Sequence, residues 1–276
     1  MKSVIYYFSA TGNSLFVAKE LALSLNAQLI SIASLINKDT ITLDSHTIGF
    51  VFPIYYNRIP VILNTLLNKA IFNNNTFIYY VCTYGGGPGE SKNMINTLLQ
   101  KRGAELSASF GIHMPQNSFY KPWENVYTIS KKAENKIHKI AKRIITIKPG
   151  MLFSDILLTS ALFPINLLVR KPTIKALAKI SDSPLTYDLN TLIYLADKGY
   201  SINSLCNGCG ICSKVCPVNN IKMIDNKPFW LNHCENCIAC YNWCPNKAIV
   251  SKIVHNGYYY KHPYIKVTEI IQQKNG

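Results

Sequence analysis

Short apolar runs alternate with helix-like segments through the first half of the chain. Each run is rich in β-branched and aromatic residues and has the length of a single strand. Strands that alternate with helices are typical of βαβ units around a parallel sheet. Together they predict an α/β domain, doubly wound around a five-stranded parallel sheet, over residues 1–148. The expected strands are Ser3–Phe8, Gln28–Ile32, Thr47–Phe52, Thr76–Cys82 and Leu106–His113, and the expected helices are Asn13–Leu25, Ile59–Lys69, Ser91–Arg102 and Ile129–Ile145.

Residues 149–200 have a different pattern. An apolar stretch over residues 151–169 approaches the length of a membrane-spanning helix. Asp155, Pro164 and Asn166 interrupt it, and polar groups inside such a span are costly. We therefore expect a helical connector packed across a domain junction. Contact with a membrane surface through residues 151–169 is the less favoured alternative.

Residues 201–252 contain an internal repeat. The segment from Cys206 to Pro217 is echoed by the segment from Cys234 to Pro245, and Ile221 corresponds to Ile249. Neither half is large enough to bury a core alone. The duplication therefore predicts a small α+β domain whose two halves are related by a pseudo-two-fold axis.

Each half of the repeat has the spacing C-x2-C-x2-C-x3-C-P, which is the pattern of bacterial ferredoxins. In that pattern three cysteines wrap one [4Fe-4S] cluster and the fourth reaches the other cluster. Zinc sites use paired C-x2-C elements, so zinc, like disulfides, is the disfavoured alternative. The resemblance implies one cluster on Cys206, Cys209, Cys212 and Cys244, and a second on Cys234, Cys237, Cys240 and Cys216.

The first expected strand leads into the loop 9–14, directly before a helix. Its hydroxyl and backbone N–H groups would surround a phosphate without a basic side chain. The motifs G-x4-G-K-[ST] and G-x-G-x-x-G are absent from this loop, which disfavours a nucleoside triphosphatase or a Rossmann NAD site. The loop resembles the [ST]-x-T-G-N-[ST] sequence with which flavodoxins bind the FMN phosphate. Over residues 1–148 this resemblance implies a flavodoxin-like fold with strand order 2-1-3-4-5 and FMN at the switch point.

Two further loops fall where flavodoxins contact the isoalloxazine ring. Residues 53–60 follow the third expected strand, and Tyr55 or Tyr56 would stack on the ring. Residues 82–89 follow the fourth, and their glycines would let backbone amides approach the flavin. The alternatives are a turn with packed tyrosines and an ordinary glycine-rich connection. The candidate FMN-binding residues are Ser9, Thr11, Gly12, Asn13, Ser14, Pro53, Ile54, Tyr55, Tyr56, Thr83, Tyr84, Gly85 and Gly86.

The composition narrows the choice of compartment and partner. A chain of 276 residues with a formal net charge of +15 would ordinarily suggest a nucleic acid or an acidic membrane as partner. Two clusters of about −2 each and an FMN phosphate of about −2 would lower this charge to about +9. Lys and Arg are scattered, which disfavours nucleic acid and leaves redox proteins, acidic ones included, as the expected partners. The apolar run Met1–Phe8 is too short for a signal peptide, so we expect a cytoplasmic protein.

The two parts together resemble ferredoxins that carry an N-terminal flavodoxin domain, and the resemblance covers nearly the whole chain. In the C-terminal tail, residues 253–276, the segment Tyr258–Pro263 resembles the basic, aromatic tail of that family. We expect the tail to form a strand and a helix packed on the cluster domain. Cys82, the ninth cysteine, is expected to be a buried thiol at a strand end.

This resemblance implies electron transfer between FMN, two [4Fe-4S] clusters and external redox partners. FMN exchanges one or two electrons and each cluster exchanges one, so the chain would link pairwise and single-electron chemistry. Two other hypotheses stay open: flavin-dependent reduction of a small acceptor such as a quinone, and redox sensing with structural clusters. We identify no acid–base or nucleophile constellation in the sequence, and no catalytic residue is predicted.

Overall fold

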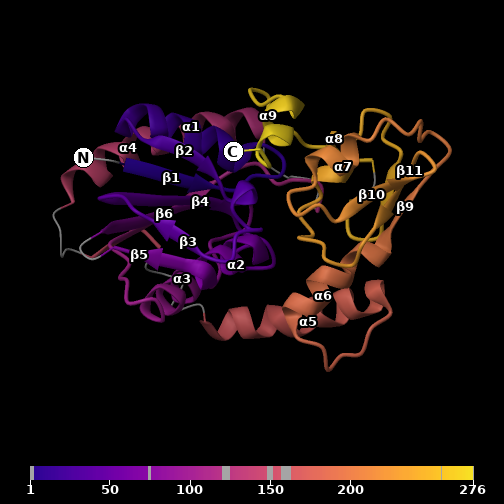
Figure 1. The fold of residues 1–276 in the computed structure, drawn as a ribbon, viewed down its shortest axis with the longest axis horizontal. Coiled ribbons are helices and arrows are strands. Elements are labelled where there is room, and N and C mark those ends of the chain that lie inside the picture. The colour runs from indigo at the N-terminus through magenta and orange to yellow at the C-terminus, as the bar shows by residue number, and fades with distance from the viewer. Residues whose placement is uncertain are drawn as a thin grey trace.

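The computed structural model shows a larger α/β domain beside a smaller domain that carries the cysteine repeat (Figure 1). The last helix of the chain, α9, lies between the two domains. The termini are therefore both associated with the larger domain, although the chain passes through the smaller one. The structure describes residues 3–73, 76–119, 125–147, 152–156, 163–255 and 257–275.

A six-stranded parallel sheet forms the centre of the α/β domain, with the strand order β2-β1-β4-β6-β7-β8. Tyr6 of β1 lies opposite Ile30 on one side and Phe50 on the other, so the order reverses beside β1. Folds of this kind bind ligands at that reversal, outside the carboxyl ends of the strands. The strands are β1 Ser3–Tyr7, β2 Gln28–Ser31, β4 Thr47–Pro53, β6 Phe77–Tyr84, β7 Ala108–His113 and β8 Phe153–Ser154.

The sheet has one strand more than the five that the sequence predicts. The additional strand, β8, pairs with the free edge of β7, where Phe153 lies opposite Ala108. A strand of two residues has no periodicity to reveal it, and it falls within the stretch expected to be helical. The five long strands have the order 2-1-3-4-5 and begin and end within two residues of the predicted positions.

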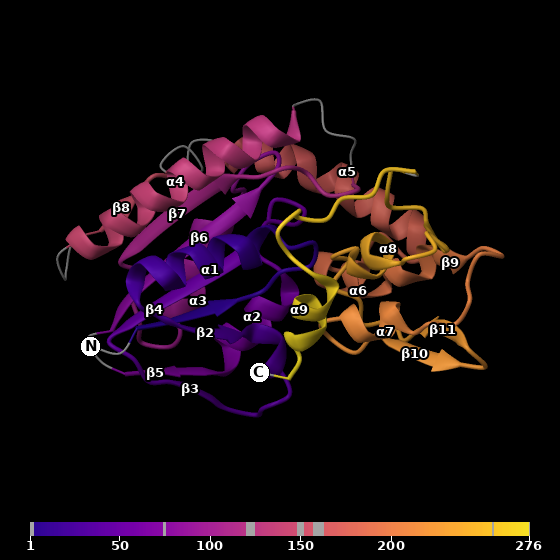
Figure 2. The same cartoon turned by 90° about the horizontal axis from the view of Figure 1, so that it is seen from above.

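Helices cover both faces of the sheet (Figures 1 and 2). Helices α1 (Asn13–Leu25) and α4 (Val126–Thr146) pack together on one face, and α2 (Val61–Lys69) and α3 (Ser91–Gln100) pack together on the other. Because both faces are covered, the central strand β4 is apolar and buried along most of its length. This explains why its sequence does not alternate between apolar and polar residues.

A second, smaller sheet in the α/β domain was not predicted. It consists of β3 (Ile41–Leu43) and β5 (Ala70–Phe72), which pair in parallel. The single-turn helix η1 (Ile32–Ser34) follows β2. Strands of three residues are too short to be separated from loops by periodicity.

Between β8 and the smaller domain, most of the described residues are helical. This segment contains α5 (Phe163–Ser181), α6 (Leu189–Leu195) and the single-turn helix η3 (Ala196–Gly199). Residues 151 and 157–162 of the apolar stretch lie outside the described residues. No helix in the described part of the chain is both long and apolar enough to cross a membrane.

Both repeats of the smaller domain fold into the same series of elements: a cysteine loop, a short helix and a strand. Helix α7 of the first repeat packs against α8 of the second. Strand β10 forms a hairpin with β11, and β12 pairs with β9, both antiparallel. The elements are β9 Tyr200–Ile202, α7 Ile211–Val215, β10 Ile221–Ile224, β11 Lys227–Trp230, α8 Ala239–Trp243 and β12 Ile249–Ser251.

The C-terminal tail corrects one expectation. Among the described residues after Ser251 there is the helix α9 (Val267–Gln272) but no strand. Helix α9 contacts α7 of the smaller domain (Figure 2). Gln273, directly after α9, forms hydrogen bonds with Ser9 of the α/β domain. The tail therefore packs on both domains, because its polar side chains find partners in the first loop as well as on the cluster domain.

Candidate functional site

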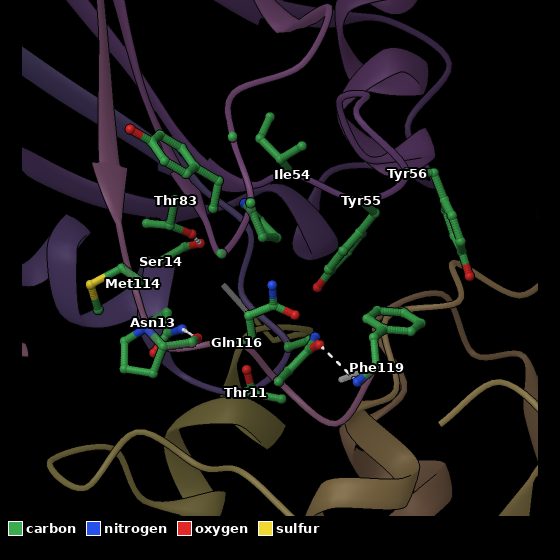
Figure 3. Close-up of a pocket in the computed structure, with 18 of the residues that line it drawn as sticks. Thr11, Asn13, Ser14, Ile54, Tyr55, Tyr56, Thr83, Met114, Gln116 and Phe119 are labelled. Carbon is green, nitrogen blue, oxygen red and sulfur yellow. Dashed lines mark hydrogen bonds between the residues drawn. The ribbon is translucent and has the colours of Figure 1, made fainter. Parts of the chain in front are cut away.

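A cavity of about 260 Å³ lies at the carboxyl ends of the central strands, where the strand order reverses (Figure 3). The three loops singled out in the sequence meet there, and none of the described residues in its wall carries a charged side chain. The structure thus brings residues from three separate loops together around one cavity. The predicted residues in the wall are Ser9, Thr11, Asn13, Ser14, Pro53, Ile54, Tyr55, Tyr56, Thr83, Tyr84, Gly85 and Gly86.

The first loop turns from β1 into α1. Gly12 is the N-cap of this helix and is the one candidate that is not in the cavity wall; it faces the tail, where an added Cβ would be 2.8 Å from the Cβ of His262. The hydroxyl groups of Ser14 and Thr83 form a hydrogen bond of 2.8 Å, which joins this loop to the carboxyl end of β6. The N-terminus of a 13-residue helix therefore adjoins a cavity whose described wall residues are uncharged, a setting that suits a phosphate.

Tyr55 and Tyr56 lie on a tight turn after β4. Tyr55 and Arg58 exchange two backbone hydrogen bonds of 3.1 and 2.8 Å, and Tyr56 and Asn57 have φ angles of 52° and 59°, as in a two-residue hairpin turn. Figure 3 shows that Tyr55 points into the cavity and Tyr56 points toward the cluster domain. The ring of Phe119 contacts both, with centroid distances of 6.3 and 5.7 Å. Burial raises the pKa of Tyr55 well above its ordinary value.

A further part of the cavity wall was missed in the sequence. It comes from the loop after β7, with Thr173 of α5 beside it. The side-chain amide of Asn13 donates to the carbonyl oxygen of Pro115 at 2.9 Å, so this loop is joined to the first one. The carboxyl ends of parallel strands meet at one edge, and this rule pointed to the loop. The missed residues of the loop are Met114, Pro115, Gln116, Asn117 and Phe119.

The first cysteine set surrounds a small hollow in the cluster domain. Three of its members come from the first half of the repeat and the fourth from the second half. Cys209 is exposed, so one side of the hollow adjoins solvent. The wall contains Cys206, Cys209, Cys212 and Cys244, together with Met223 and Pro228 of the β10–β11 hairpin.

The second cysteine set, Cys216, Cys234, Cys237 and Cys240, lies deeper, next to the α/β domain. All but Cys234 are buried, and Cys237 packs with the core of that domain. Burial raises the pKa of the Cys240 thiol well above its ordinary value, and the nearby charges of Cys237 and Cys216 raise it further. Burial, followed by the charges of Cys237 and Cys240, also raises the pKa of Cys234. Burial thus favours the neutral thiols, and a positively charged partner would be needed to hold these sulfurs as thiolates.

The backbone contacts the sulfur atoms at matching positions of the repeat. The N–H of Asn220 donates to Sγ of Cys216 at 3.2 Å, and the N–H of Ala248 donates to Sγ of Cys244 at 3.3 Å. Each donor is four residues after its cysteine. Such N–H donation to ligand sulfur is a means by which proteins tune iron–sulfur clusters.

The two short helices also begin alike. Gly210, before α7, and Ile238, before α8, both have left-handed backbone, with φ angles of 71° and 53°. They occupy equivalent positions of the repeat, each directly after the second cysteine. The backbone path around the two cysteine sets is therefore duplicated together with the sequence.

The arrangement of the thiols bears on the choice of metal. All nine cysteines are free, in contrast to the disulfide alternative. Within the described residues no three Cys, His, Asp or Glu side chains converge closely enough to hold one metal ion. Zn–S bonds of about 2.3 Å would draw four sulfurs around one point. A [4Fe-4S] cluster binds each thiolate to a separate iron and keeps the sulfurs farther apart. The preference for clusters over zinc rests on the C-x2-C-x2-C-x3-C-P spacing in the sequence.

A chain of hydrogen bonds joins the cavity wall to the second cysteine set. The side-chain amide of Asn236 donates to the hydroxyl of Tyr56 at 2.5 Å. The backbone N–H of Asn236 donates to Sγ of Cys234 at 3.2 Å. One residue thus contacts both a wall of the cavity and a cysteine of the cluster domain.

Comparisons with known proteins agree with the cysteine motif. The model of the 4Fe-4S binding domain family matches residues 200–222. No curated protein matches the chain. These residues and the strand order define a flavodoxin-like domain joined to a ferredoxin-type 4Fe-4S domain, an architecture of electron-transfer proteins.

Several solved structures are similar to about half of the chain. An FMN-dependent NADH-azoreductase from Bacillus anthracis has 10% identity and a TM-score of 0.39, with 52% of this chain and 99% of that one covered. A flavodoxin from the domain Archaea has 16% identity and a TM-score of 0.34, covering 52% and 99%. A flavone reductase has 12% identity and a TM-score of 0.42, covering 56% and 67%. At these TM-scores, the flavodoxin-like fold rests on the strand order described above.

Proposed function

We propose that this chain is an electron-transfer protein that binds FMN in the cavity and one [4Fe-4S] cluster on each cysteine set, and that it relays electrons between them and external redox proteins. FMN supplies one- or two-electron exchange, and each cluster supplies one-electron exchange. The cavity, the duplicated cysteine motif and the contact between them support this proposal.

The residues of the cavity fit FMN. Its phosphate would lie at the first loop, where the N-terminus of α1 and the hydroxyls of Thr11 and Ser14 offer uncharged donors. Its ring system is flat and apolar, and Tyr55 and Phe119 supply aromatic surface at the other end of the cavity. The protein would therefore bind the phosphate through dipoles and the ring through packing.

The observation that carries the relay is the hydrogen-bonded path Tyr56–Asn236–Cys234. It starts at the cavity wall and ends on a sulfur of the second set. The second set is buried against the α/β domain, whereas the first set has the exposed Cys209. This arrangement supports the order cavity, second set, first set, solvent.

The surface beside the first set supports an acidic redox protein as partner. On the outer face of the β10–β11 hairpin, Lys222 is paired with Phe229, and Ile224 with Lys227. Phe229 is 56% exposed and Ile224 46% exposed, while the inner residues Met223 and Pro228 face the first cysteine set. Over residues 200–252 five lysines are exposed, against one exposed acidic residue, Asp225. An apolar centre with a basic surround suits a partner of opposite charge.

Anaerobic purification with iron, sulfide and FMN analysis tests this proposal. We expect about eight irons and one flavin per chain. A reductive titration followed by optical and EPR spectra should then show both flavin and cluster signals. Protein that binds only zinc would contradict the cluster assignment. Protein that stays free of flavin after reconstitution with FMN would contradict the flavin assignment.

A further inference from the structure

The first loop of the cavity is held from outside by residues of the other domain and the tail. The side chain of Gln273 brackets Ser9: Nε2 donates to the Ser9 carbonyl at 2.9 Å, and Oε1 accepts from the Ser9 N–H at 3.1 Å. The indole N–H of Trp243 donates to the carbonyl of Ala10 at 2.8 Å. All of these groups are buried, and Ser9 and Gln273 are 264 residues apart in sequence.

Two more hydrogen bonds connect the tail to this loop. The backbone N–H of His262 donates to the carbonyl of Thr11 at 2.8 Å. The hydroxyl of Tyr260 donates to Oδ1 of Asn13 at 2.7 Å. Three consecutive carbonyl groups of the loop, at positions 9, 10 and 11, thus accept hydrogen bonds from residues beyond position 240.

These hydrogen bonds to the loop carbonyl groups fix the direction of the N–H groups in the loop. In a planar trans peptide the C=O of one residue and the N–H of the next point in opposite directions. Carbonyls 9 to 11 point toward Gln273, Trp243 and His262, so the N–H groups of residues 10 to 12 point away from them. Ser9, Ala10 and Thr11 line the cavity, and successive N–H groups at a helix N-terminus form an anion-binding surface.

The same domain also holds the other loops of the cavity. Oδ1 of Asn242 accepts from the hydroxyl of Ser118, in the loop after β7, and from the N–H of Tyr260 at 2.8 Å. Asn236 donates to Tyr56 in the loop after β4. Asn242 and Trp243 lie on helix α8, between Cys240 and Cys244.

From these contacts we infer that the FMN phosphate site is a joint product of both domains. Trp243 and Gln273 are positioning residues that aim the N–H groups of the first loop at the phosphate. Because Trp243 lies between a cysteine of the second set and one of the first, cluster loading fixes helix α8 and thereby the loop. FMN retention therefore depends on a loaded cluster domain. This inference rests on the proposed FMN site.

Two substitutions test the positioning role. Trp243→Phe keeps an aromatic ring but removes the N–H, and Gln273→Ala removes both bonds to Ser9. Trp230→Phe is the matched control, since the Trp230 indole N–H has no hydrogen-bond partner among the described residues. Gln272→Ala is the control for Gln273, because Gln272 is exposed. The dissociation constants of FMN and of riboflavin, which lacks the phosphate, are measured by flavin fluorescence on the cluster-loaded protein.

We expect each test variant to weaken FMN binding about tenfold, as for a buried carbonyl that loses its donor. Riboflavin binding should change little, so the ratio of the two affinities falls, and both controls should keep the wild-type ratio. Unchanged FMN affinity in Trp243→Phe and Gln273→Ala would overturn the inference, and so would an equal loss for FMN and riboflavin. Wild-type protein that binds neither flavin would instead reject the proposed function itself.

Iron removal tests the dependence on the clusters. The wild-type protein is treated anaerobically with an iron chelator, and circular dichroism verifies that the α/β domain stays folded. We expect the preference for FMN over riboflavin to fall as far as in Trp243→Phe. Full retention of the preference would show that the loop keeps its shape without the clusters. If the whole chain unfolds, cluster loading controls FMN retention through folding, and Trp243→Phe alone decides the positioning role.

Discussion

Gly89 lies directly against the carbonyl oxygen of Asn57, so that an added Cβ atom at position 89 would overlap with it. The same oxygen accepts the N–H of Glu90 at 2.7 Å. Gly89 has a φ angle of +55°, which non-glycine residues adopt at a cost. The contact fixes the glycine-rich loop after β6 to the turn that carries Tyr55 and Tyr56.

Gly89→Ala should therefore destabilise the protein and disturb two loops of the cavity. Gly103→Ala is the control, because Gly103 also has a positive φ of 67° but nothing lies within 4 Å of its added Cβ. We expect about 1 kcal/mol of lost stability in the control from backbone strain alone. Overlap with Asn57 should add about 1–3 kcal/mol in Gly89→Ala. Denaturant unfolding measures both, and equal losses would contradict the contact.

Cysteine substitutions should separate the two clusters. Cys216→Ser removes a cysteine of the second set that is contributed by the first half of the repeat. We expect iron to fall from about eight to about four atoms per chain, with the remaining EPR signal that of the first set. Cys82→Ala should leave iron unchanged, since Cys82 is buried in β6, where burial raises its pKa to about 12. Equal iron loss in both variants would contradict the assignment.

Tyr56→Phe should slow electron exchange between flavin and clusters without changing their content. It removes only the hydroxyl that accepts from Asn236. We expect a several-fold slower equilibration after rapid reduction of the flavin, followed by stopped-flow absorbance. Tyr127→Phe is the control, because Tyr127 is 74% exposed on α4. Wild-type kinetics in Tyr56→Phe would show that electrons take another route.

Stability should fall in mild acid because of His262. This residue stacks on Phe16 at a centroid distance of 4.3 Å, and burial lowers its pKa to about 4. The unfolded chain, with a pKa of about 6.5, binds the proton first, so stability is full above that pH and is lost as the pH falls toward 4. We expect a loss of about 1 kcal/mol between pH 7 and 5.5. In His262→Phe this part of the dependence of the unfolding free energy on pH, measured by denaturant unfolding, should disappear. An unchanged dependence would show that other groups cause the loss.

Charge reversal on the hairpin should weaken transfer to an acidic acceptor. Lys222→Glu with Lys227→Glu changes the surface beside the first cysteine set. Lys92→Glu on α3 with Lys101→Glu at the C-cap of that helix makes the same net change in the other domain. With rubredoxin as acidic acceptor, the second-order rate at low salt should fall at least about tenfold in the hairpin variant only. An equal fall of the rate in both variants would show that the net charge of the protein, and not docking at the hairpin, controls the transfer.

The sequence predicts the parts of this protein that depend on local pattern. Buried strands such as β4 are continuous apolar runs, and the amphipathic helix α4 follows its period, so their positions were found within a few residues. The cysteine repeat is also a local pattern, because the spacing of its cysteines predicts how the chain turns around a cluster. The short strands β3, β5 and β8 have too few residues for any period.

Long-range contacts could not be predicted in this way. Nothing in the sequence around Gln273 indicates that it brackets Ser9, since both are ordinary polar residues whose meeting depends on the packing of two domains. The tail was therefore expected to stay on the cluster domain. Phe119 was not predicted, because the expected ring contacts follow the third and fourth strands, whereas the carboxyl end of the fifth strand reaches the same edge.

Gly210 and Ile238 occupy equivalent positions of the repeat, but they leave the two cysteine sets differently exposed to water. An isoleucine with left-handed backbone costs about 1–2 kcal/mol, yet its side chain is only 1% exposed and screens the second cysteine set from water. The first set has a glycine there and an exposed Cys209. Water stabilises added negative charge, so identical clusters would accept an electron more readily at the first set. One repeated motif would thus create a downhill gradient for electrons toward the surface.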